Sequence, residues 1–137
     1  MILTINDNLA IEDLQERFSL CFPHLKIEFY KKPHHWKAAS SEKDRIDPQT
    51  RIGDIRKKHN QGELEIKSFD LAGKVENEFR DRFGLYVQIY RNENGDWIQT
   101  TSTDSCSLKD QGSFSDHAKV SILPKSRKQI DEYRFYL

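Results

Sequence analysis

Five histidines and two cysteines are the residues of this chain best suited to metal binding or nucleophilic chemistry. A structural zinc site usually takes two ligands from one turn, as in C-x2-C or H-x3-H, and neither spacing occurs. His34 and His35 are adjacent, so in an extended chain their side chains point to opposite sides. A site built from His34, His59 and Cys21 is conceivable, but exposed loop histidines are the favoured interpretation. We therefore predict no metal and no cofactor.

The two thiols do not complete a catalytic constellation. Cys106 precedes a possible helical turn starting at Ser107, and the N-terminus of a helix favours a thiolate. A nucleophile of this kind also needs a partnering base, and no motif supplies one. Cys21 falls near the apolar stripe of a predicted helix, which favours a core thiol. We assign no catalytic residue, and the sequence favours a protein that is not an enzyme.

A basic segment suggests a different chemistry, the binding of a phosphate backbone. The chain as a whole is neutral, with 22 Lys and Arg and 22 Asp and Glu, which argues against a generally basic nucleic-acid binder. Residues 31–62 nevertheless carry nine Lys and Arg against four Asp and Glu. Tyrosines on the polar faces of predicted strands could stack on bases. The candidate contact residues for nucleic acid or another partner are Tyr30, Lys32, Trp36, Lys37, Arg56, Lys57, Lys58, Tyr86 and Tyr90.

The strand pattern weighs against this nucleic-acid surface. A sheet of the RNA-recognition type stacks bases on aromatic residues, which it presents from its first and third strands. The corresponding predicted strands, Met1–Ile5 and Glu63–Lys67, carry no aromatic residue. We therefore expect the tyrosines to be covered by the C-terminal segment or by a partner. Binding of single-stranded nucleic acid through residues 31–58 is kept as the alternative function.

The elements that must position these residues follow a pattern that occurs twice. Residues 3–5 match residues 64–66, and in both halves an apolar stripe at helical spacing follows. The halves span residues 1–37 and 63–102. Genuine duplication and chance similarity between two amphipathic units both stay open. The stripes are Ile11, Leu14, Phe18 and Phe22 in the first half and Leu71, Val75, Phe79 and Phe83 in the second.

Local signals mark the ends of these elements. Asp7 or Asn8 should cap the first helix, and Ser68 or Asp70 the second, because short polar side chains accept hydrogen bonds from free helical N–H groups. Asn94-Gly95 is typical of a type I′ hairpin, so the chain should return antiparallel after it.

Two βαβ(β) units in series predict the α+β class. A ferredoxin-like antiparallel sheet with both helices on one face is the candidate arrangement, and two βαββ halves with a small sheet each are the alternative. We expect one domain, residues 1–137, because a chain of this length buries a core without staples. Residues 38–62 form a basic, flexible linker with a short helix in this scheme, and residues 103–137 a C-terminal extension.

The expected environment is the cytoplasm. Mean hydropathy is −0.82, and no apolar run approaches the ~18 residues of a membrane span. The first ten residues show no secretory signal, and two cysteines are too few for a disulfide scaffold. We therefore predict no membrane association and reduced thiols.

The sequence F-G-L-Y-V-Q-I-Y-R at 83–91, followed by W-I-Q-T at 97–100 and T-D at 103–104, resembles a family of small uncharacterised bacterial proteins. Its members share F-G-L-x-V-Q-x-x-R, then W-x-x-T, then T-D, and the resemblance covers about residues 1–110. They often carry an aromatic residue where Cys106 stands, which weakens a thiol mechanism further. The resemblance implies a compact cytoplasmic domain and supplies neither a function nor catalytic residues.

The end of the chain is aromatic. Such an end should not remain in water, so we expect it to dock on the core or on a second copy. Because no catalytic constellation is found, the favoured function is a non-enzymatic protein-binding or assembly module that can form a homodimer. The candidate self-association residues are Tyr133, Phe135, Tyr136 and Leu137.

Overall fold

A computed structural model describes residues 1–34 and 39–112 of the chain. Among the predicted site residues, Trp36 and Lys37 lie outside the described residues, as does the aromatic end Tyr133–Leu137. The strands and helices, in chain order, are β1 (Ile2–Ile5), α1 (Ile11–Cys21), β2 (Leu25–Tyr30), β3 (Gly62–Glu65), α2 (Ala72–Phe83), β4 (Tyr86–Glu93) and β5 (Asp96–Gln99). Three short 3-10 helices join them, η1 (Glu42–Asp44), η2 (Ile52–Asp54) and η3 (Thr101–Thr103).

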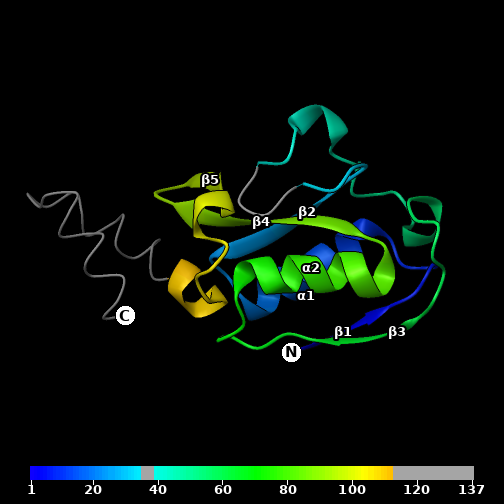
Figure 1. Ribbon diagram of the computed structural model, residues 1–137, viewed down its shortest axis with the longest axis horizontal. Coiled ribbons are helices and arrows are strands. Elements are labelled where there is room, and N and C mark those ends of the chain that lie inside the picture. The colour runs from blue at the N-terminus through cyan, green and yellow to red at the C-terminus, as the bar shows by residue number, and fades with distance from the viewer. Residues whose placement is uncertain (35–38, 113–137) are drawn as a thin grey trace, which may run out of the picture.

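The strands form two antiparallel sheets, β1-β3 and β2-β4-β5. Figure 1 shows α1 and α2 running between the three-stranded sheet above and the two-stranded sheet below. The α+β class is therefore confirmed. Each sheet takes strands from both halves of the sequence, so neither half closes a sheet by itself.

The predicted apolar stripes face this core. Phe18 on α1 and Phe79 on α2 are fully buried, and the ring of Phe79 meets that of Phe29 on β2 edge-on. Two ends of the stripes differ from expectation, because Phe22 is only partly buried and Leu71 is exposed just before α2 begins. Cys21, expected in the core, is also exposed at the last turn of α1.

The helices begin without the predicted side-chain caps. Their N-cap residues are Ala10 and Leu71, whose side chains cannot accept a hydrogen bond. Main-chain carbonyls from later in the chain satisfy the free N–H groups instead, since Ile11 N donates to Thr50 O and Ala72 N donates to Cys106 O, each at 2.9 Å. The predicted side-chain caps at Asp7, Asn8, Ser68 and Asp70 are therefore wrong. Main-chain carbonyls from distant residues accept the hydrogen bonds that a local side-chain cap would accept.

Other local signals are confirmed. Asn94 and Gly95 both have positive φ, 54° and 91°, as a type I′ turn requires, and β5 pairs antiparallel with β4 after them. The segment 39–61, expected as a flexible linker, instead packs on the core through Ile46 and Ile52. Among the described residues, no helix is both long and apolar enough to cross a bilayer.

Candidate functional site

Two of the three predicted base-stacking tyrosines are buried. Tyr30 and Tyr90 are 3% and 8% exposed, and their hydroxyl groups are hydrogen-bonded to each other. Burial raises the pKa of both phenols above the ordinary value. Arg45 forms an antiparallel β-bridge with Tyr30, and the expected cover by the C-terminal segment concerns residues outside the described part of the chain. Tyr86 is partly exposed beside a separate small pocket.

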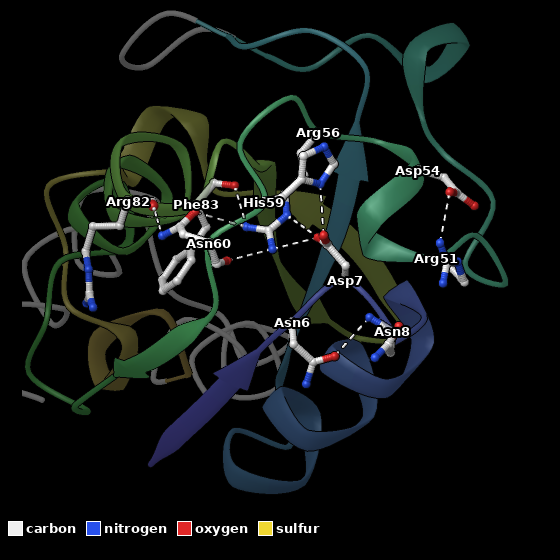
Figure 2. A network of polar contacts seen from close by, with 10 residues as sticks. All are labelled: Asn6, Asp7, Asn8, Arg51, Asp54, Arg56, His59, Asn60, Arg82 and Phe83. Carbon is white, nitrogen blue, oxygen red and sulfur yellow. Dashed lines mark hydrogen bonds and ion pairs between the residues drawn. The ribbon is translucent and has the colours of Figure 1, made fainter.

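Arg56, predicted as a contact residue for nucleic acid, is held inside the protein. Its side chain has no exposed surface, and its guanidinium donates to Asp7 Oδ1 at 2.9 Å, to Phe83 O at 3.1 Å and to Asn60 O at 2.7 Å. Figure 2 shows these groups converging on the guanidinium from three separate segments. The guanidinium of Arg56 is therefore engaged in an internal network, and its charge cannot neutralise a phosphate.

The same network holds an aspartate–histidine pair. His59 Nδ1 lies 2.9 Å from Asp7 Oδ2, and the imidazole is more than half exposed (Figure 2). Burial would raise the pKa of Asp7, but the hydrogen bonds and charges of Arg56 and His59 hold it below its ordinary value. Since Asp7 also fixes Arg56, we interpret the pair as part of a structural clamp.

The exposed members of the predicted surface are lysines. Lys32, Lys57 and Lys58 all face solvent, and Lys58 Nζ donates to Asp81 O at 3.0 Å. The structure therefore brings no exposed aromatic residue of the predicted set into contact with an exposed cluster of cations, within residues 1–34 and 39–112.

A buried carboxylate, Glu76 of α2, is a further candidate. It accepts hydrogen bonds from Ile89 N at 2.8 Å and Gln88 Nε2 at 3.2 Å, and His34 Nε2 lies 3.3 Å from its second oxygen. Burial raises the pKa of Glu76, the charge of Asp104 adds to the rise, and the bonds from His34 and Ile89 oppose it.

The space beside Glu76 is too small for a substrate. The pocket that His34, Glu76 and Tyr86 help to line measures about 20 Å³, which holds about one water molecule. Glu76 instead satisfies the N–H of Ile89 on β4. No cluster of His, Cys, Asp and Glu suited to a metal ion occurs in the described part of the chain.

The residues that carry the family resemblance, at 83–91, 97–100 and 103–104, have a structural role. Thr100 Oγ1 donates to Ile89 O at 3.0 Å, and Arg91 Nη1 donates to Thr103 Oγ1 at 2.9 Å. Gln111, fully buried, donates to Thr103 O at 2.6 Å. These bonds hold the segment 100–112 on the core and so place its last described residue, Gly112.

Gly112 lies at an apolar groove of about 470 Å³ at the C-terminal end of α1. The groove is formed by the N-terminus, the end of α1 with the start of β2, the stretch after β3 and the segment 108–112. Its apolar lining residues include Met1, Phe22, Pro23, Ile66 and Leu108.

Two large, exposed apolar side chains are next in the chain to residues that line this groove. Leu20 is 74% exposed and Phe69 is 70% exposed, and their chain neighbours Cys21 and Ser68 line the groove. We call Leu20 and Phe69 the rim. Neither residue was predicted from the sequence, although Leu20 breaks the polar face of its helix and Phe69 is an apolar residue in a polar loop. Such single exposed residues are common, and only the fold shows that the chain neighbours of these two line the same groove.

Comparison of the chain with protein-family models, curated proteins and solved structures finds no match. The family resemblance therefore stays a prediction.

Proposed function

We propose that this chain is a non-enzymatic protein-binding module that assembles with a second copy of itself. The observation that carries the proposal is the rim: Leu20 and Phe69 are the most exposed large apolar side chains of the described residues, and their chain neighbours Cys21 and Ser68 line one apolar groove. Exposed apolar surface next to a groove is typical of an interaction site. A second copy is the proposed partner of the rim, because residues 113–137, which follow directly after the groove residue Gly112, end in apolar and aromatic side chains.

The aromatic end supplies the complementary surface. Residues 113–132 connect Gly112 to Tyr133 and could span at most about 75 Å, so the end of one copy can reach the rim of the other. A twofold pair would make this contact twice, since each copy offers one rim and one end. Tyr133, Phe135, Tyr136 and Leu137 would bury apolar area against Leu20 and Phe69, at about 25 cal/mol per Å² of buried apolar area.

The alternative, binding of single-stranded nucleic acid, has weaker support. Tyr30, Tyr90 and Arg56 are buried, which leaves Lys32, Lys57 and Lys58 as exposed members of that surface in the described residues. Lysines alone would give weak affinity that salt abolishes. A titration with a labelled oligonucleotide at low salt tests it, and binding lost in a Lys57→Ala, Lys58→Ala variant would revive it.

Light scattering coupled to size-exclusion chromatography tests the assembly. We expect the full chain to run as a dimer in the micromolar range. A chain ending at Lys125 and a Leu20→Ser, Phe69→Ser variant should run as monomers with unchanged melting temperature. Trp97→Ser is the matched control, because Trp97 is an exposed aromatic residue on β5. A monomeric full chain, or a dimer that the rim variant preserves, would overturn the proposal.

A further inference from the structure

The two halves of the chain make the same main-chain contacts with the segment that follows each half. Residues of the second half follow their counterparts by 61 positions around the helix starts, and by 56 in the later segment. Four hydrogen bonds recur in this way. Those of the first half are Ile11 N to Thr50 O, Glu12 N to Pro48 O, Ile52 N to Leu9 O and Gly53 N to Asp7 O. Their counterparts are Ala72 N to Cys106 O, Gly73 N to Asp104 O, Leu108 N to Asp70 O and Lys109 N to Ser68 O.

The strand registers show the same relation. In β1-β3, Leu3 pairs with its own counterpart Leu64. The turn before β4 is one residue shorter than the turn before β2, so counterparts in these two strands are 60 positions apart, and Glu28 pairs with its counterpart Gln88. Pairing of this kind is what a twofold axis between two copies produces. The side chains that reach from helix to strand are also related. Gln15 donates to Glu28 Oε1 at 2.8 Å, and Gln88 donates to Glu76 Oε2 at 3.2 Å, so the same two positions carry the amide and the carboxylate in exchanged order.

This relation makes the C-terminal ends of the two helices counterparts of each other. At the end of α2, the residues that follow η2 occupy the site. Arg56, Lys58 and Asn60 donate to the carbonyls of Phe83, Asp81 and Arg82, at 3.1, 3.0 and 2.9 Å. Figure 2 shows Arg56 and Asn60 against the end of that helix.

At the end of α1, the counterpart positions border the apolar groove. Gly112 corresponds to Arg56, Ser68 corresponds to Asp7, and Phe22 corresponds to Phe83; all three counterparts line the groove. The groove is thus the equivalent of the site that residues 56–60 fill in the first half. Its own filling residues would come directly after Gly112.

We infer that the residues following Gly112 occupy this groove within their own chain, and that Phe114 is the side chain that fills it. Phe114 corresponds to Lys58. The replacement of a lysine by a phenylalanine matches the surface at each site. The α2 end presents carbonyls and the Asp7 carboxylate, which suit cations. The groove presents the apolar side chains of Met1, Phe22, Ile66 and Leu108, which suit an aromatic ring. This inference goes beyond the proposed assembly, because it assigns the groove to the chain itself and leaves the rim to the second copy.

Disulfide trapping locates the segment. Cys21 lines the groove and is exposed, so a Ser113→Cys variant in a Cys106→Ser background should form an intramolecular disulfide under mild oxidation. Ser126→Cys in the same background is the matched control and should react far less. Mass spectrometry of the non-reduced protein distinguishes the products. A bond that forms only between two copies, or a yield no higher than the control's, would overturn the inference.

Thermal melting of the full-length chain provides the second readout. Phe114→Ala should lower the melting temperature by about 5–10 °C, while Ile122→Ala, which truncates an apolar side chain further along and outside the proposed self-association residues, should leave it unchanged. Equal melting temperatures for the two variants would contradict the inference. The mass measured by light scattering reports on the assembly, so a monomer with an intramolecular disulfide would refute only the proposed function.

Discussion

The ends of α1 and α2 stand in equivalent places in the fold and differ in chemistry. The α2 end is closed by a buried guanidinium and by side-chain donors to three carbonyls. The α1 end is an apolar groove with two exposed residues on its rim. The difference depends on few positions, chiefly Arg56 against Gly112 and Asp7 against Ser68. One backbone arrangement can therefore support a self-contained polar clamp at one end and a surface for docking at the other.

The largest effect should come from removing the clamp. Arg56→Met leaves the Asp7 carboxylate and the carbonyls of Phe83 and Asn60 without their donor, so we expect a loss of about 3 kcal/mol in the free energy of unfolding. Urea denaturation measures it. The matched control is Arg51→Met, whose exposed pair with Asp54 should contribute less than about 0.5 kcal/mol. Equal losses of unfolding free energy for the two variants would mean that the clamp stabilises the α2 end no more than an exposed ion pair does.

A smaller loss should follow from crowding the clamp. A Cβ added at Gly53 would lie 2.8 Å from Asp7 Cβ, so Gly53→Ala should displace Asp7 and cost about 2 kcal/mol. The counterpart of Gly53 is Lys109, which has a side chain. Gly112→Ala is the control, since nothing lies within 4 Å of its added Cβ in the described structure. Chemical denaturation that shows no loss for Gly53→Ala would disprove the close approach.

The smallest effect concerns the exchanged helix-to-strand pairs, and its sign is opposite. Glu76→Gln gives the second half the amide that Gln15 supplies in the first half. Because burial raises the pKa of Glu76, its ionisation opposes folding once the pH passes the ordinary value for glutamate. The variant should therefore be more stable at neutral pH, by up to about 1 kcal/mol, and the gain should vanish in acid. Denaturation curves across pH measure this difference.

Asp7→Asn is the reference for this pH series, because its effect on stability at neutral pH should have the opposite sign to that of Glu76→Gln. The pKa of Asp7 is lowered in the folded protein, so its contribution is complete above the ordinary aspartate value and is lost as the pH falls through the lowered one. The variant should thus be less stable at neutral pH and match the parent in strong acid. A destabilised Glu76→Gln variant at neutral pH would show instead that the ion pair with His34 outweighs the cost of burial.

Elements with a strong local period were predictable. The stripe through Leu14 and Phe18 and the turn at Asn94-Gly95 both follow from backbone geometry that neighbouring residues settle among themselves. The helix caps were not predictable in the same way. Ala10 and Leu71 can start helices only because carbonyls of residues 48–50 and 104–106 reach the free N–H groups, and a sequence does not show that approach.

The candidate site was harder to predict than the fold. The groove could not be predicted from the sequence, because its walls come from four separate stretches and Cys21 carries no sign that it lines the groove. Arg56 looked like a surface cation because its neighbours are lysines, whereas its partners Asp7 and Phe83 lie far away along the chain.

The sequence by itself determined the α+β class, the helical stripes, the alternating strands and the hairpin, because each depends on interactions between residues close along the chain. The tertiary structure alone decided which strands pair, which charges are buried and where the groove lies. Those outcomes depend on contacts between distant residues, and burial converts the same side chain from a surface cation into an internal clamp.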